Sequence, residues 1–205
     1  MILLTAFEPF GKSDVNASQE VAERLERRMN GLIAKAILPV VRHEAVRVAL
    51  ACVNGLRERE TPPRLFVALG EAGPEAVVRL EKVYLNWDDY RIPDNAGNQP
   101  RDSAIEVDGP TAYFATVPVS KIEAELHHKT PLPVRVSLSA GAFLCNHTAY
   151  AVSHALACEN SAGRNVPWFL FVHVPAWRPG DGEETLSALV ETAEAVLLAC
   201  LSTAS

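Results

Sequence analysis

Strand-like and helical hydrophobic patterns alternate along the whole of this 205-residue chain. Short apolar runs with strand character are separated, in most places, by segments whose apolar residues recur at helical spacing. The expected strands are 2–6, 34–39, 65–69, 77–85, 113–116, 134–137 and 168–174, and the expected helices are 18–29, 43–57, 120–128, 146–158 and 183–201. Such alternation is typical of layered α/β proteins. We therefore expect residues 1–205 to form one domain, a three-layer α/β/α sandwich with a mixed, largely parallel twisted sheet.

Charge and cysteine usage narrow the classes of function. The net charge is −6 and no run of Lys and Arg occurs, so nucleic acid is not an expected partner. No apolar stretch approaches the ~20 residues that span a bilayer, and residues 1–7 lack the basic start of a signal peptide, so no membrane partner is expected. Cys52, Cys145, Cys158 and Cys200 form no C-x-x-C pair, which favours free thiols in a reducing cytoplasm.

Cys145 stands where a strand-like run, 134–137, gives way to a helical pattern formed by Ala149, Val152 and Leu156. The start of a helix carries unpaired amides and partial positive charge, which favour a thiolate over a thiol. Cys145 is therefore a candidate nucleophile. The alternative is a small core hydrophobe, the commoner fate of a lone cysteine.

A base and an orienting carboxylate for this thiol also have candidates. His173 is at the carboxyl end of an expected strand, where parallel sheets bind ligands, and Glu81 is a carboxylate in a mostly apolar strand. The alternatives are a hydrogen-bonded core histidine and a surface salt bridge of Glu81 with Lys82 or Arg79.

Two long loops, 9–16 and 90–110, interrupt the pattern, and loops of this length are usually functional or disordered. His147 and His154 are seven residues apart on one expected helix, but no acidic or thiolate partner completes a metal site. We expect both to be surface or packing residues, with no metal bound.

Five blocks of sequence, in order along the chain, carry a resemblance to one family. They are 5–11 followed by Asn16, Glu81 with Asn86, 91–97, 139–146 and 171–175. Together they resemble pyroglutamyl peptidase I, also called pyrrolidone-carboxyl peptidase, from the first strand to at least Pro175. The resemblance implies a phosphorylase/hydrolase-like fold and a cytoplasmic cysteine peptidase without metal or cofactor. It further implies removal of N-terminal pyroglutamate from peptides by a homo-oligomer, a tetramer or dimer.

The resemblance also assigns roles to individual residues. Cys145 matches the nucleophile, His173 the general base and acid, and Glu81 the carboxylate that orients the imidazole. Backbone amides at the start of the Cys145 helix would hold the oxyanion, with Arg91 adding charge and Asp94 supporting the site.

The same resemblance predicts the substrate pocket. Its residues are Phe7, Phe10, Asn16, Gly70, Glu71, Phe143 and Leu144. A pyroglutamyl ring is a flat, uncharged lactam, so it needs apolar walls and a few hydrogen bonds. Phe7 and Phe10 match a pair that sandwiches the ring, and backbone groups around Gly70 and Glu71 would meet the lactam. The alternatives are core packing for the phenylalanines and a helix cap for Asn16.

Several positions depart from the family pattern. They are Lys12, Pro74-Glu75, Leu138 and the segment Ala176-Trp177-Arg178. Two alternatives therefore remain beside the peptidase: a homologue with changed acyl specificity, and a catalytically silent protein that binds pyroglutamyl or other peptides. A metal-dependent hydrolase with Cys and His ligands has little support from the spacing. We also expect Trp177 and the 90–110 loop to be exposed contact surfaces.

Overall fold

The computed structural model describes residues 1–11, 13–73 and 75–203, so the departures at Lys12 and Pro74 lie outside the described residues. The elements in chain order are β1 (Ile2–Phe7), α1 (Ala17–Arg28), β2 (Ile33–Leu38), α2 (Glu44–Glu58), β3 (Leu65–Ala72), β4 (Val78–Glu81), β5 (Val83–Leu85), β6 (Ala112–Phe114), α3 (Val119–Leu126), β7 (Val134–Ser137), α4 (Leu144–Ser161), β8 (Trp168–Pro175), the 3₁₀ helix η1 (Pro179–Asp181) and α5 (Glu183–Thr203).

A six-stranded sheet with the order β2-β1-β3-β8-β4-β7 forms the middle layer. The pairs β1–β2, β1–β3, β3–β8 and β4–β7 are parallel, and the pair β4–β8 is antiparallel. The carboxyl ends of β1, β3 and β8 therefore meet the start of β4 at one edge of the sheet. The expectation of a mixed, largely parallel sheet is confirmed.

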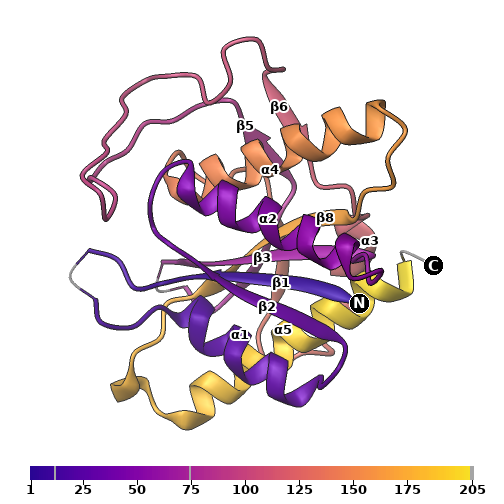
Figure 1. The fold of residues 1–205 in the computed structure, drawn as a ribbon. Helices are drawn as coiled ribbons and strands as arrows, with labels where there is room; N and C mark the ends of the chain where they lie inside the picture. Colours follow the sequence, from indigo (N-terminus) through magenta and orange to yellow (C-terminus); the bar gives the residue numbers. More distant parts are fainter. Residues whose placement is uncertain (12, 74, 204–205) are drawn as a thin grey trace.

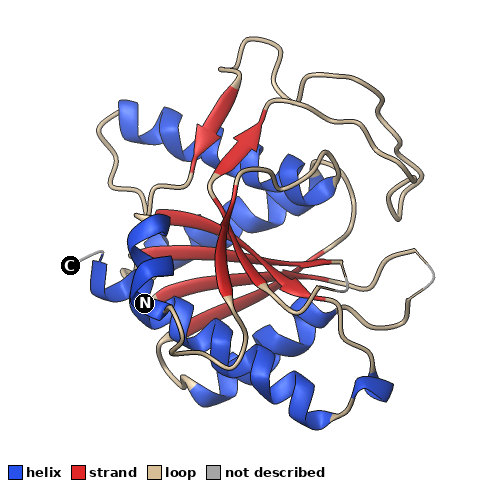
Figure 2. Cartoon of the chain, turned by 180° about the vertical axis from the view of Figure 1, so that it is seen from behind, coloured by secondary structure: helices blue, strands red, loops and turns tan. Residues whose placement is uncertain are grey.

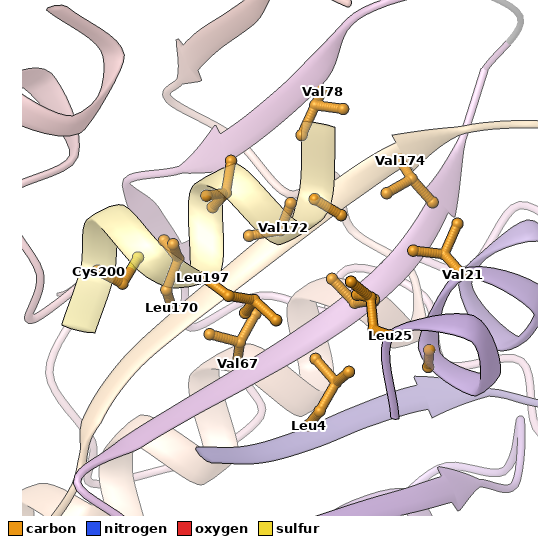
Figure 3. Close-up of a cluster of buried hydrophobic side chains, with 14 of the residues drawn as sticks. Leu4, Val21, Leu25, Val67, Val78, Leu170, Val172, Val174, Leu197 and Cys200 are labelled. Atoms are coloured by element: carbon orange, nitrogen blue, oxygen red, sulfur yellow. The ribbon is translucent and has the colours of Figure 1, made fainter. Parts of the chain in front are cut away.

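Helices cover both faces of this sheet, with α1 and α5 on one side and α2 and α4 on the other (Figures 1 and 2). Two apolar cores result, one on each face. Figure 3 shows part of the first, where Val67 of β3 belongs to the same cluster as Leu25 of α1 and Leu197 of α5. Alternate strand residues supply the two cores, as the pleat requires. The α/β/α layering is confirmed.

The expected single strand 77–85 is two strands in the structure. β4 belongs to the main sheet, but the chain leaves it at Lys82, whose N–H donates to Ser137 O and whose C=O accepts from Ala115 N–H. β5 then pairs with β6, the expected strand 113–116, in a separate two-stranded sheet. Apolar residues continue through the break because the second sheet packs on α4, so hydrophobicity alone did not mark it.

Helix α5 is long and apolar enough, by length and composition, to cross a membrane, which differs from the expectation that no such segment exists. Half of that segment is buried inside the fold. Leu186, Leu189 and Val190 are in the core between α5 and the sheet. Here the apolar stripe of α5 therefore covers one face of the sheet.

Candidate active site

Cys145 lies in the first turn of α4, directly after Leu144, and the residue that precedes the helix is Phe143. Gly141 enters this turn with φ 82°, a left-handed conformation that glycine adopts without strain. The first N–H groups of a helix have no intrahelical acceptor, so they remain available to an anion beside the sulfur. The predicted position of the thiol at a helix start is confirmed.

His173 and Glu81 meet on neighbouring strands. His173 Nδ1 is 2.8 Å from Glu81 Oε1, and both side chains are buried. Glu81 is opposite Phe171 in the antiparallel pair β4–β8, so its carboxylate reaches two residues along β8 to the imidazole. Glu81 Oε2 has no hydrogen-bond partner among the described residues. The carboxylate is therefore committed to His173 rather than to a surface salt bridge.

The surroundings of His173 favour its charged form. Burial lowers the pKa of this imidazole, but the negative charge of Cys145 and hydrogen bonds to Cys145 and Glu81 outweigh burial and raise the pKa to about 9. Because Nδ1 faces Glu81, the other ring nitrogen is left for the sulfur. The imidazole of His173 is thus held in its readily protonated form between the side chains of Cys145 and Glu81.

Gly70 of β3 lies beside this centre. A Cβ atom added to Gly70 would be 2.9 Å from the Phe171 ring and 3.1 Å from Cys145 Sγ. Real side chains do not tolerate such approaches without displacing a neighbour. Glycine therefore lets β3 pass close to the thiol, which places this predicted residue at the site.

A cavity of about 340 Å³ opens onto the three catalytic candidates. Its other walls include Phe7, Phe10, Asn16, Glu71, Phe143 and Leu144. The Phe10 and Phe143 rings are 6.1 Å apart between centroids, close enough to pack as a pair. Six of the predicted pocket residues are thus brought together around one cavity of ligand size.

Two polar residues of this cavity are fixed by the fold. Asn16 Oδ1 accepts from Ser18 N–H at 3.0 Å, so Asn16 caps α1 while it also lines the cavity. Glu71 accepts from Ala17 N–H at 2.7 Å and from two nitrogens of Arg178 at 2.9 and 2.8 Å. The negative charge of Glu71 is therefore neutralised at the pocket wall.

Arg91 and Asp94 are not among the described residues that line the cavity. Arg91 is exposed. Asp94 is buried, and its carboxylate accepts from the backbone N–H groups of Arg42, Ala96 and Asn98 at 2.7–2.9 Å. These contacts anchor the loop that carries both residues, and the predicted support of the oxyanion remains a prediction.

A second histidine–carboxylate pair lies nearby. His147, two residues after Cys145, has Nδ1 at 2.8 Å from Asp88 Oδ2, and neither side chain is exposed. Arg42 Nε also donates to Asp88 Oδ2 at 2.9 Å, and the His43 ring packs against His147 at 5.0 Å. No local pattern pointed to this pair, because 59 residues separate its members.

Arg79, Ser137 and Ser139 also line the cavity, and none of them was among the predicted pocket residues. Arg79 forms an ion pair with Glu75. Its position two residues before Glu81 was the available signal, because residues i and i+2 of a strand lie on the same face.

Trp177 is not the exposed contact that we expected. Its side chain is buried, and its Nε1 donates to Gly182 O at 3.0 Å. The indole therefore packs the segment after β8 onto the fold. Within the part of the chain that the structure describes, no group of three or more His, Cys, Asp or Glu side chains is arranged to hold a metal ion.

Comparison with known proteins agrees with this arrangement. The family model for pyroglutamyl peptidase matches residues 1–185. The pyrrolidone-carboxylate peptidase of Gloeobacter violaceus is 44% identical over 178 residues, which are 85% of this chain and 80% of that protein. The corresponding protein of Klebsiella pneumoniae is 39% identical over 209 residues, with 96% and 92% of the two chains covered. The crystal structure of Bacillus amyloliquefaciens pyroglutamyl peptidase I has a TM-score of 0.84 at 27% identity and covers 100% of this chain and 98% of that one. The chain therefore belongs to the pyroglutamyl peptidase family.

Proposed function

We propose that this protein hydrolyses the bond after the N-terminal pyroglutamyl residue of peptides, with Cys145 as nucleophile. The observation that carries the proposal is the position of His173, whose Nδ1 lies 2.8 Å from Glu81 and which lines one aromatic-walled cavity together with Cys145. A nucleophile, a base and an orienting carboxylate in this order are the requirements of thiol peptidase chemistry.

Acylation follows from the charge state of the pair. The Cys145 thiolate attacks the pyroglutamyl carbonyl carbon, and the carbonyl oxygen becomes an oxyanion. Backbone N–H groups at the start of α4 are the donors available to that oxygen. The His173 imidazolium gives its proton to the leaving nitrogen as the C–N bond breaks. The products are a thioester on Cys145 and a peptide shortened by one residue.

Deacylation reverses these roles. His173, now neutral, removes a proton from a water molecule as its oxygen attacks the thioester carbonyl. The C–S bond then breaks, pyroglutamate leaves, and the thiolate–imidazolium pair is restored. Glu81 keeps the imidazole oriented through both steps, since its contact to Nδ1 does not involve the reacting nitrogen.

The pocket suits an uncharged ring. Phe10 and Phe143 supply apolar walls, and the two acidic wall residues already have partners: Glu71 pairs with Arg178, and Glu81 pairs with His173. Between the Phe10 and Phe143 walls, a free carboxylate or ammonium in the acyl group would lose solvation without gaining a charged partner. We therefore propose selectivity for the lactam over open-chain glutamate.

We also propose a cytoplasmic homo-oligomer, a dimer or tetramer. The four cysteines Cys52, Cys145, Cys158 and Cys200 are free, which suits a reducing compartment. Phe114 and Leu138 are large apolar side chains with exposures of 61% and 69%, and such surfaces favour association. Light scattering on the purified protein tests the assembly, and a monomer at micromolar concentration would contradict it.

The test of the activity is hydrolysis of a fluorogenic pyroglutamyl amide, with and without reductant, by the wild type and Cys145→Ala. We expect thiol-dependent turnover that falls by roughly 10⁴-fold or more in the variant, because the covalent route is removed. Cys158→Ala is the matched control and should keep wild-type turnover. Inactive wild-type protein would instead favour changed acyl specificity or a binding role.

A further inference from the structure

The strand order divides the cavity into two halves, one on each side of His173. Cavity residues lie in a row across the sheet, with Phe7 on β1, Glu71 on β3, His173 on β8, Arg79 on β4 and Ser137 on β7. His173 stands in the middle of this row. The phenylalanine Phe7 is on one side of it, and a cation and a hydroxyl are on the other.

This order sets the direction of the substrate, given the proposed function. With the lactam against the phenylalanine side and its carbonyl at Cys145, the leaving nitrogen must face the imidazole that protonates it. The rest of the peptide then continues past His173 toward β4 and β7. The β4 and β7 half of the cavity is therefore where the leaving residue lies.

Arg79 is the cation of that half. It is directly opposite His173 in the antiparallel β4–β8 pair, where side chains start about 5 Å apart on one face of the sheet. Leu80 belongs to the core on the opposite face, which confirms that Arg79 and Glu81 share the face of the cavity.

The present partner of Arg79 is weakly held. The guanidinium pairs with Glu75, whose side chain is 74% exposed while that of Arg79 is 25% exposed. Exposed ion pairs contribute little stability, so an incoming carboxylate can replace Glu75 at small cost. The planar guanidinium can bind such a carboxylate through two parallel N–H donors.

We infer that Arg79 binds a carboxylate on the leaving side of the substrate, which makes pyroglutamyl peptides with a carboxylate on the first leaving residue the preferred substrates. That carboxylate is either the free C-terminus of a dipeptide or the side chain of an acidic residue that follows pyroglutamate. The proposal rests on the proposed function and adds to it a substrate class.

The experiment compares kcat/KM for three substrates: pyroglutamyl-alanine, its C-terminal amide, and pyroglutamyl-glutamate with an amidated C-terminus. Released pyroglutamate is measured by chromatography. We expect the wild type to prefer at least one carboxylate substrate over the neutral amide by about tenfold, the usual size of a charge-assisted contact. The two acidic substrates separate the C-terminal carboxylate from the side-chain carboxylate.

Variants assign the preference to Arg79. Arg79→Gln should reduce the ratio of acid to amide turnover to near one, and Arg79→Lys should keep part of it. Glu75→Gln should raise the ratio, because the competing carboxylate is gone. Arg135→Gln is the control: Arg135 is the neighbour of Arg79 on β7 but is not among the described cavity residues, so the ratio should not change.

The outcomes are distinct. A wild-type ratio near one, or a ratio that survives in folded Arg79→Gln, overturns the role of Arg79 and leaves the proposed peptidase standing. Absence of hydrolysis of all three substrates overturns both. Comparing ratios within each variant removes any general loss of activity, and thermal melts identify a variant that does not fold.

Discussion

Two histidine–carboxylate pairs, His173–Glu81 and His147–Asp88, lie near the same thiol and have the same geometry. In each, Nδ1 is 2.8 Å from a carboxylate oxygen, and the side chains are buried. They differ at the rest of the ring. His173 reaches Cys145 and the cavity, whereas His147 Nε2 has no hydrogen-bond partner among the described residues.

The carboxylates differ as well. Glu81 serves His173 alone, but Asp88 Oδ2 is shared between His147 and Arg42. A histidine oriented by a carboxylate is therefore not evidence of catalysis. The chemistry requires a nucleophile at the second nitrogen and a space in which substrate can meet it, and only the first pair lines a cavity with both. The second pair joins the loop at Asp88 to the starts of α2 and α4.

The largest expected difference between the pairs is in activity. His173→Gln should lower kcat/KM by about 10³-fold, because both proton transfers lose their group. His147→Gln should keep kcat/KM within about tenfold of wild type, since a buried imidazole that does not line the cavity transfers no proton to the substrate. Steady-state kinetics on a pyroglutamyl amide measures both. Equal losses in the two variants would break the distinction between the pairs.

Thermal stability should depend more on the His147–Asp88 pair than on the His173–Glu81 pair. Asp88→Asn leaves Arg42 and His147 without their shared anion in a buried site, so we expect a loss of about 3 kcal/mol in the free energy of unfolding. For a chain of this size that lowers Tm by roughly 10 °C. Glu81→Gln should lower Tm less than Asp88→Asn. The glutamine keeps a hydrogen-bonding oxygen for His173, and no arginine loses an ion-pair partner. Calorimetry on both variants decides the order.

Reactivity of the thiol should depend on one pair only. Cys145 should react with iodoacetamide faster than the other cysteines, because the imidazolium of His173 favours its thiolate. Burial raises the pKa of Cys200 to about 12 and raises that of Cys52 as well, so both should react slowly.

His173→Gln should slow the labelling of Cys145 by about tenfold, while His147→Gln should not. Mass spectrometry of the alkylated peptides measures each rate. The internal reference is Cys158, which is exposed in the last turn of α4 with its Sγ 3.7 Å from His154 Nε2. Similar rates for Cys145 and Cys158 in the wild type would mean that the helix start and His173 do not activate the sulfur.

The comparison also marks what the sequence could predict. The strands, the helices and the position of Cys145 at a helix start follow from local periodicity, which acts over a few residues. The pair His173–Glu81 is different, because its members are 92 residues apart: the sequence pattern offered each only as a candidate beside an alternative, and the family resemblance assigned their roles. Asp88 and His147 matched no block of that resemblance, so their contact could not be foreseen.

Other departures have the same physical origin. The strand 77–85 is split at Lys82, whose backbone bonds Ser137 of β7 on one side and Ala115, just after β6, on the other. The side chain of Trp177 is buried because it packs in the core beside α5, and its Nε1 donates to Gly182 O. Hydrophobicity reports that a side chain is buried but not which layer buries it. The position of Arg79 in the cavity could have been predicted once Glu81 was placed in the site, because residues two apart on a strand share a face.

The smallest expected effect is a shift in pH dependence. The pKa of His173 is raised to about 9 by Cys145 and Glu81 against the opposing effect of burial. The imidazolium that protonates the leaving amine therefore persists up to that pH, and kcat/KM should fall above it. Glu81→Gln removes a negative charge that raises this pKa, so the alkaline limb should move to lower pH. Asp88→Asn, measured well below its Tm, should keep the limb near that of the wild type. If the alkaline limb moves in Asp88→Asn and not in Glu81→Gln, the essential proton belongs to His147 and not to His173. That result would reverse the roles that the geometry gives the two pairs.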